Sequence, residues 1–207
     1  MNIDDIKIYL PKFLSPESEK ELFEGLRDFP KNIDERLYTD YLIDTEKIYQ
    51  GDGLLDLLVV NLPDVAIKPA PCMVFSNSCD MDLDNQRLFK SQIVYAPILN
   101  LKKYQEALLS EARTKSKENI LSHIETIRHQ RITQIFYLPM ITGKIEESIV
   151  FLDRVCNMPS NHIDRKSIQK RKIFTLSDYG AYLFLLKLSI HFTRIQDNLE
   201  RRNTHIA

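Results

Sequence analysis

Glycine is scarce in this chain, since only 5 of its 207 residues are glycine. Loops that cradle phosphate groups use several closely spaced glycines, so there is little room for a glycine-rich nucleotide-binding loop. The sequence also contains neither the HExxH pattern of a helical zinc site nor the GxSxG pattern of a nucleophilic serine. We therefore predict no cofactor and no resident metal.

Cysteine is also scarce, and the sequence has no long apolar run and no excess of charge of one sign. Cys72, Cys79 and Cys156 are odd in number and have no CxxC spacing, which is typical of a reducing compartment. The longest apolar run, AYLFLLKLSIHF, is interrupted by Lys187 and His191 and is shorter than the roughly 20 residues of a membrane-spanning helix. Lys and Arg number 28 against 29 Asp and Glu, so no global charge demands nucleic acid or an anionic membrane. We expect a cytoplasmic protein that does not enter a membrane.

The patterning predicts a single domain of mixed α+β class. With 207 residues and 43% hydrophobic content, the chain can bury one core. Apolar side chains at helical spacing, Leu22, Phe23, Leu26 and Phe29, predict an amphipathic helix over residues 16–29. Strand composition occurs in six segments: residues 36–49, 54–63, 72–78, 92–98 and, around a turn at Gly143-Lys144, 134–141 and 147–158. Because these strands are close in sequence, we expect antiparallel pairing.

Two helical regions complete this outline. Asn100 caps an insertion over residues 101–133, which polar residues break near 113–118. Ser177 and Asp178 begin a last helix after a short strand. We expect one face of that helix to carry Leu183, Leu186, Ile190 and Ile195.

The stretch APCMVFSNSCDMDLDNQR, residues 70–87, allows three interpretations. Asp80, Asp82 and Asp84 alternate like the opening of a calcium loop, but Asn85 stands where that loop has glycine and Ser91 where it has glutamate. We prefer a solvated turn, with a weak metal site as the alternative.

Cys79 as a nucleophile is the second interpretation of this stretch. It would need a base, and the spacing of the five histidines selects none. The third interpretation is structural: Asn77, Ser78 and Asp80 suit the sharp exit from a strand, because their side chains bond to nearby backbone.

A basic run is the main feature that could meet RNA. It comprises Arg165, Lys166, Lys170, Arg171 and Lys172. Phosphates would be bound if the fold brought this run to Arg128 and Arg131. Aromatic residues are sparse around it and charge runs are usually solvated faces, so RNA binding is the minority interpretation.

Five segments in order resemble the PemK/MazF-like family of small bacterial toxins. Gly51-Asp52 before LLDLLVV is similar to the opening GD and first strand of the family. PCMVFSNS resembles its "RPVLVIS" strand, and IVYAPI its "V-P-I-T" strand. IVFLDRVCNMP is similar to "V-L-D-Q-V-R-S-L-D", and KIFTLSDYGAYLFLLKLSIHF resembles the final strand and helix.

The resemblance implies a small, curved, antiparallel SH3-like β-barrel with an N-terminal helix, a helical insertion and a C-terminal helix, often in a homodimer. It places the barrel and last helix over residues 47–100 and 134–196, after an N-terminal extension over residues 1–46. Family members that cleave RNA use an arginine before the proline of the second motif and a Thr or Ser after P-I of the third. Those positions here hold Ala70 and Leu99.

Two function hypotheses follow. The first is a noncatalytic MazF-like protein that captures a protein partner, such as an antitoxin or another regulator. Noncatalytic MazF-like proteins are known in phage-defence operons, including one in a CRISPR-associated Lon protease system that holds a sigma factor inactive. We expect the rim of the partner or RNA site at Asn77, Ser78 and Asp80, with turn chemistry alone as the alternative.

The second hypothesis is a metal-independent, sequence-specific endoribonuclease of single-stranded RNA whose site is rebuilt from Lys68, Asp80, Asn100 and the basic run. A ligand-binding or structural subunit is a third possibility, because a fold does not by itself imply a function.

Overall fold

The computed structural model describes Glu17, Lys20, Glu24 and residues 36–63, 66–85, 88–89, 91–111 and 117–193. The three isolated residues have helical backbone, as expected for residues 16–29. The apolar residues of that predicted helix, Leu22, Phe23, Leu26 and Phe29, lie outside the described residues.

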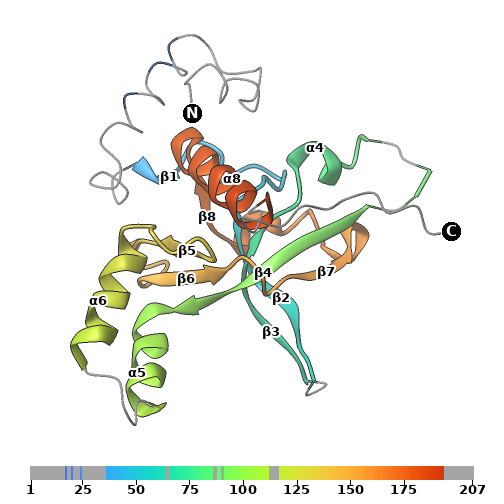
Figure 1. Cartoon of the computed structure of the whole chain (residues 1–207). Helices are drawn as coiled ribbons and strands as arrows, with labels where there is room; N and C mark the ends of the chain where they lie inside the picture. Colours follow the sequence, from blue (N-terminus) through green and yellow to red (C-terminus); the bar gives the residue numbers. More distant parts are fainter. Residues whose placement is uncertain are drawn as a thin grey trace, which may run out of the picture.

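A curved antiparallel sheet forms the centre of the molecule (Figure 1). Its strands are β1 (Tyr38–Thr39), β2 (Gly53–Asn61), β3 (Ala66–Val74), β4 (Gln92–Asn100), β5 (Ile135–Leu138), β6 (Ser148–Phe151), β7 (Cys156–Pro159) and β8 (Lys172–Leu176). The order is β1-β8-β2-β3-β4-β6-β5, and β7 pairs with β4 off this path. The mixed α+β class and the antiparallel pairing are therefore confirmed.

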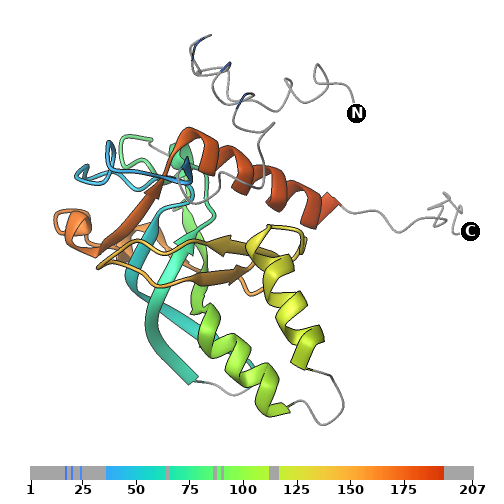
Figure 2. The ribbon, with the colours of Figure 1, turned by 90° about the vertical axis from the view of Figure 1, so that its left-hand side faces the viewer.

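Helices flank this sheet. They are α4 (Ser78–Met81), α5 (Leu101–Glu111), α6 (Lys117–Arg128), α7 (Ile168–Arg171) and α8 (Asp178–Thr193), with a 3-10 turn, η2 (Ser160–His162). Figure 2 shows α5 and α6 side by side at one end of the molecule and α8 lying across the other. The predicted break is confirmed, because α5 ends at Glu111 and α6 begins at Lys117. In the described part of the chain, no helix is both long and apolar enough to cross a membrane.

Several strand boundaries differ from the sequence-based prediction. The segment predicted as a strand over residues 72–78 ends as β3 at Val74, and α4 begins at Ser78. The segment over 147–158 divides into β6 and β7, which pair with successive parts of β4. The hairpin between β5 and β6 is confirmed, with Gly143 at φ +76° in its turn. Glycine reaches this backbone conformation without the steric cost that a side chain imposes.

Helix α8 packs closely against the backbone at Leu37. A Cβ atom at Gly180 would lie 2.1 Å from the Leu37 carbonyl oxygen, so only glycine allows this approach. Ser177 caps the helix as predicted, accepting a hydrogen bond from the Gly180 N–H at 3.0 Å.

The predicted apolar face of the last helix is wrong in part. Leu183 is buried, but Ile190 is 44% exposed, while Lys187 is only 6% exposed. Ile195 lies outside the described residues. The buried stripe runs instead through Tyr179, Leu183, Phe184 and Lys187, because the core lies under that side of the helix.

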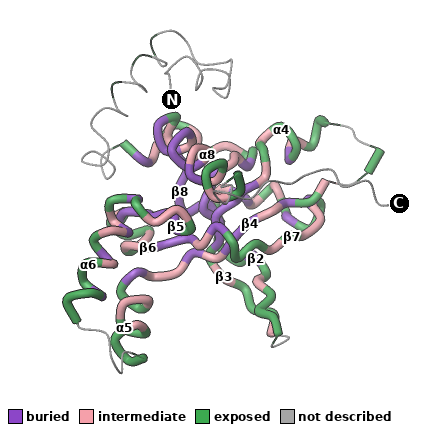
Figure 3. Tube along the Cα trace, viewed as in Figure 1, coloured by how far each residue is buried: buried purple, intermediate pink, exposed green. Residues whose placement is uncertain are grey.

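Two apolar clusters stabilise the sheet. Buried residues gather at its centre, where the strands cross, while the ends of the β2–β3 hairpin and of α5 are exposed (Figure 3). The larger cluster joins α8, β5 and β6, and in it Phe184 contacts Phe75 and Phe136 with ring centroids 5.2 and 5.4 Å apart. The smaller cluster lies between β2, β3, β4 and the segment before β8, and includes Leu57, Tyr95 and Ile168. The two clusters together fix the curvature of β3 and β4, because each of these strands contributes to both.

Candidate functional site

A pocket of about 450 Å³ opens beside α4. We call it the α4 pocket; it is lined by Glu46, Lys47, Ile48, Tyr49, Ser78, Cys79, Met81, Asp82, Leu83, Asp84 and Arg165. Its volume falls within the range of small-ligand or side-chain pockets. Three segments distant in sequence meet here, namely residues 46–49, the region of α4, and the residues before α7.

Two of the three predicted rim residues hold the backbone around this pocket. Asn77 is the N-cap of α4, and its Oδ1 accepts a hydrogen bond from the Cys79 N–H at 2.9 Å. Ser78 Oγ accepts from the Gln50 N–H at 2.9 Å, which ties α4 to the turn before β2. Asp80 is exposed on α4. The structure therefore places all three residues together and shows turn chemistry at Asn77 and Ser78.

Two opposite charges on the pocket wall, Lys47 and Asp82, form an ion pair. Lys47 Nζ lies 3.0 Å from Asp82 Oδ2, and this ammonium lowers the pKa of the Asp82 carboxyl. The other oxygen of Asp82 accepts from the Asp84 N–H at 3.1 Å. Arg165 Nη2 donates to the Met81 carbonyl at 3.1 Å, and burial lowers the pKa of its guanidinium. Through these contacts the Asp82 carboxylate holds the turn that follows α4 in place.

Neither metal nor thiol chemistry gains support from the geometry of this region. Among the described residues, no group of three or more His, Cys, Asp or Glu side chains is placed to hold a metal ion. Cys79 is exposed, Cys156 is half-buried, and Cys72 is buried, which raises the pKa of its thiol to about 12. The Cys72 thiol is therefore not a nucleophile at neutral pH, and among the residues that line the α4 pocket beside Cys79 there is no histidine to act as its base.

Most of the basic run contacts the protein itself. Arg171 donates to the Leu55 carbonyl at 2.8 Å and to the Asp56 carbonyl at 2.9 Å, at the bulge of β2 where Asp56 has φ +59°. Lys172 is buried and donates to the Leu42 carbonyl at 3.1 Å. Of the five residues, Lys166 and Lys170 are the exposed ones. The run is therefore largely structural.

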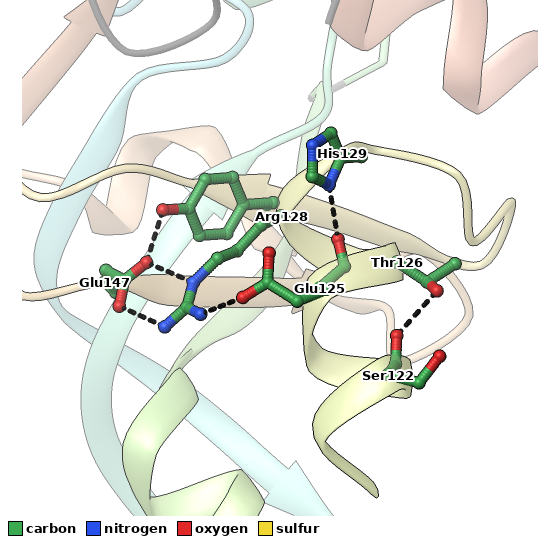
Figure 4. A network of polar contacts seen from close by, with 7 residues as sticks. Ser122, Glu125, Thr126, Arg128, His129 and Glu147 are labelled. Carbon is green, nitrogen blue, oxygen red and sulfur yellow. Dashed lines mark hydrogen bonds and ion pairs between the residues drawn. The ribbon is translucent and has the colours of Figure 1, made fainter. Parts of the chain in front are cut away.

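The second basic cluster also has internal partners (Figure 4). Arg128 makes a two-pronged contact with Glu147, from Nε to Oε1 and from Nη2 to Oε2, each at 2.8 Å. Its Nη1 lies 2.5 Å from Glu125 Oε1, and the Tyr137 hydroxyl donates to Glu147 at 2.6 Å. This network joins α6 to the β5–β6 hairpin. In Figure 1, α6 and the segment after β7 lie at opposite sides of the sheet, so the two basic groups are not brought together.

The residues suggested for a rebuilt nuclease site occupy separate elements. Lys68 is exposed on the part of β3 that extends away from β4, opposite Val59. Asp80 belongs to α4, and Asn100 ends β4, where its Oδ1 caps α5 by accepting from the Lys103 N–H at 3.0 Å. In Figure 1 the β2–β3 hairpin, α4 and the start of α5 point in three directions.

Ala70 and Leu99 lie on neighbouring strands. The last paired residues of β3 and β4 are Cys72 and Pro97, and Ala70 and Leu99 each lie two residues beyond that pair. Both are half-buried, but Ala70 packs against the smaller cluster, whereas Leu99, on the part of β4 that pairs with β6, packs against the larger one.

Sequence reasoning missed two features of this region. Residues 46–49 line the α4 pocket, although nothing in their composition connects them with residues 78–84. Sequence reasoning did not single out Glu147 either, although this residue directly precedes β6. No protein-family model matches the chain, and no curated protein matches it.

Proposed function

We propose that this chain is a noncatalytic, MazF-like binding protein that captures a protein partner. Its finer fold, within this proposal, is an SH3-like barrel built from β2, β3, β4, β7 and β8. The curvature of these strands and their antiparallel pairing support that assignment.

The observation that carries the proposal is the apolar setting of Ala70 and Leu99. The resemblance assigns these positions to the catalytic arginine and to the catalytic Thr or Ser, and in the structure they lie on adjacent strands, each packed against an apolar cluster. Cleavage of RNA by its own 2′-hydroxyl needs stabilisation of charge on the phosphate and a group that transfers a proton. A methyl and an isobutyl group supply neither, whereas apolar side chains suit the binding of a protein.

The cationic groups argue in the same direction. Arg128, Arg171 and Lys172 make their contacts with carboxylates and carbonyl groups of the same chain. A phosphate would have to displace those contacts, so the affinity for RNA gained per cation would be small. We infer that the partner is a protein regulator, such as an antitoxin or a sigma factor, and that the chain can form a homodimer.

An RNA cleavage assay tests this function. The purified protein is incubated with mixed-sequence single-stranded RNA, beside a variant carrying Asp80→Ala and Asn100→Ala and beside a bacterial endoribonuclease as positive control. We expect both forms of this protein to leave the RNA intact. Cleavage by the wild type that is lost in the variant would overturn the proposal and establish a rebuilt nuclease site. Cleavage by both forms would point to a nuclease site elsewhere and would overturn it equally.

A further inference from the structure

The wall of the α4 pocket includes a guanidinium that has no carboxylate partner. Arg165 lines the pocket and is half-buried. In the described part of the chain its one hydrogen bond runs from Nη2 to the Met81 carbonyl, and it forms no ion pair. Its Nε is buried and has no hydrogen-bond partner. A cation withdrawn from water is costly unless an acceptor compensates it, so this group is suited to an anionic acceptor that enters the pocket.

Two carboxylates that line the same pocket are also unpaired. Glu46 and Asp84 are both exposed. Among the described residues, neither carboxylate forms a hydrogen bond or an ion pair, and only the backbone N–H of Asp84 is engaged, by Asp82. The other two charges of the pocket, Lys47 and Asp82, already contact each other at 3.0 Å. The pocket therefore keeps unpaired groups of both signs.

The three segments that form the pocket are fixed to one another. The Gln50 N–H donates to Ser78 Oγ at 2.9 Å, and Gln50 Nε2 donates to the Phe75 carbonyl at 2.6 Å, which holds residues 46–49 against α4. Arg165 joins the third segment to α4 through the Met81 carbonyl. A pocket that is already formed binds a small ligand at little cost in ordering.

Apolar side chains supply the rest of the pocket wall. Ile48 and Met81 are buried and belong to the smaller cluster, so this part of the wall is anchored in the core. Tyr49 is half-buried, and Leu83 is 63% exposed. An aliphatic group in the pocket would remove apolar surface of Leu83 from water and so gain affinity.

A ligand that uses all the unpaired groups must carry both charges. A simple anion would be attracted by Arg165 but repelled by Glu46 and Asp84, and a simple cation would meet the reverse difficulty. A zwitterion brings a carboxylate to the guanidinium and an ammonium group to the carboxylates, so both of its ends gain charge-assisted hydrogen bonds. A free α-amino acid with an aliphatic side chain is such a ligand, and a pocket of about 450 Å³ accommodates it.

We propose that the α4 pocket binds a free aliphatic α-amino acid. Its carboxylate contacts Arg165, and its ammonium group contacts Glu46 and Asp84. Its side chain packs against Leu83. This site goes beyond the proposed capture of a protein and does not depend on it, because it rests on the unpaired groups of the pocket alone.

Isothermal titration calorimetry of the full chain, with L-leucine as the probe, tests this site. Two analogues each lack one charge: isocaproate has no ammonium group, and isoamylamine has no carboxylate. A third, N-acetyl-leucinamide, has the same side chain but neither charge, like a leucine within a protein chain. We expect leucine to bind at least tenfold more tightly than each analogue, about 1.4 kcal/mol, because each analogue leaves polar groups of the pocket unpaired.

The first variant removes the two carboxylates. Glu46→Gln combined with Asp84→Asn changes exposed side chains, so the fold should be kept. We expect this double variant to weaken leucine at least tenfold and to strengthen isocaproate, because the repulsion of the anion is removed. Glu106→Gln combined with Glu118→Gln, on α5 and α6, changes the net charge equally at exposed positions and should leave the affinity for leucine unchanged.

The second variant, Arg165→Met, removes the contact with the carboxylate. We expect leucine to bind this variant no more tightly than isoamylamine does. Lys166→Met, at the exposed neighbouring position, is the control and should keep the preference for leucine. Arg165→Met also loses the hydrogen bond to the Met81 carbonyl, so thermal melts check its folding. If it does not fold, the analogues and the carboxylate double variant decide the question.

Three results would overturn this inference. These are no binding of leucine by the folded wild type, equal affinity for leucine and either singly charged analogue, or unchanged affinity for leucine in the carboxylate double variant. Binding of N-acetyl-leucinamide as tight as that of leucine would overturn it too, and would assign the pocket to a side chain of a protein partner. None of these measurements involves RNA cleavage, so the inference can fail while the noncatalytic assignment stands.

Discussion

Lys187 of α8 places its Nζ 2.9 Å from Oε1 of Gln130, in the turn between α6 and β5. The same ammonium donates to the Gln130 and Ile132 carbonyl oxygens at 3.0 and 2.9 Å and to the Ile135 carbonyl oxygen. A buried lysine with no carboxylate among these partners is costly unless its protons are hydrogen-bonded. These four oxygen atoms, which we call the carbonyl cage, meet that need and hold α8 against the turn that follows α6.

The first prediction concerns the pH dependence of stability. Burial lowers the pKa of Lys187 from 10.5 to about 7, so the folded state releases this proton at a lower pH than the unfolded state does. The unfolded chain therefore binds more protons between about pH 7 and 10.5, and the free energy of unfolding rises with pH in that window, by up to ~1.4 kcal/mol per unit. Below pH 7 the full cost of charging the buried amine is present. Lys187→Met should remove this rise.

Urea denaturation at pH 6.5, 7.5, 8.5 and 9.5 checks the effect as the difference between wild type and Lys187→Met. Lys117→Met, at an exposed position, serves as the control and should follow the wild type. Parallel curves for wild type and Lys187→Met would show that Lys187 keeps an ordinary pKa in its cage.

Gln130→Ala is the second prediction, and it tests the contact between Gln130 and β5. The substitution removes the hydrogen bonds of the Gln130 side chain to the Tyr137 N–H, to the Tyr137 carbonyl and to the Lys187 ammonium. Leaving buried polar groups unpaired costs about 1–3 kcal/mol each, so we expect a loss of roughly 2–4 kcal/mol in the free energy of unfolding. Gln134→Ala, at an exposed position nearby, should change it by less than about 0.5 kcal/mol. Amide hydrogen exchange at Tyr137 should also become faster, and unchanged exchange there would contradict this role.

The sequence contains the periodicities that define most elements, and the strands and helices were predicted largely from them. The hairpin at Gly143 and the caps at Asn100 and Ser177 were found because turn and cap chemistry is local. The buried face of α8 was missed, because Lys187 interrupts an apolar run and lysine is almost never buried alone. Its carbonyl cage comes from residues more than fifty positions away, and no local pattern announces it.

The candidate site likewise has some residues that a local sequence pattern predicts and others that no local pattern reveals. Asn77 and Ser78 were found because a polar cluster after an apolar run marks a strand exit. The burial of Lys172 was not foreseen, because in the sequence it is one of five basic residues of equal appearance. Only the register of β8 against β2, with Lys172 opposite Leu54, turns this side chain inward.

The third prediction concerns the buried pair that results. Lys172 Nζ lies 3.4 Å from Asp52 Oδ2, and both side chains are fully buried. Burial raises the pKa of Asp52 and lowers that of Lys172, so both groups are shifted toward their neutral forms. Removal of one partner leaves the other buried and uncompensated, so Lys172→Met should cost about 3–5 kcal/mol.

A double-mutant cycle with Asp52→Asn measures the coupling. We expect the double variant to be more stable than the sum of the single losses predicts, by about 0.5–3 kcal/mol. Additive losses, measured by chemical denaturation, would show that the two groups do not interact across 3.4 Å.

The last prediction concerns the network that docks α6. The Arg128 contact lowers the pKa of Glu147 below its ordinary 4.5, and the Tyr137 hydroxyl adds to that effect against the opposing influence of burial. A depressed carboxyl pKa contributes stability above about pH 4.5, and this is lost as the pH falls through the folded-state value. Glu147→Gln should therefore lower stability at pH 7 by about 1 kcal/mol or less, since the pair is partly exposed to solvent. It should also flatten the fall in stability below pH 4.5 relative to the wild type. Glu146→Gln, one residue earlier and exposed, should reproduce neither change in acid titrations followed by circular dichroism. If the two variants titrate alike, the two-pronged contact of Arg128 does not hold α6 to the sheet.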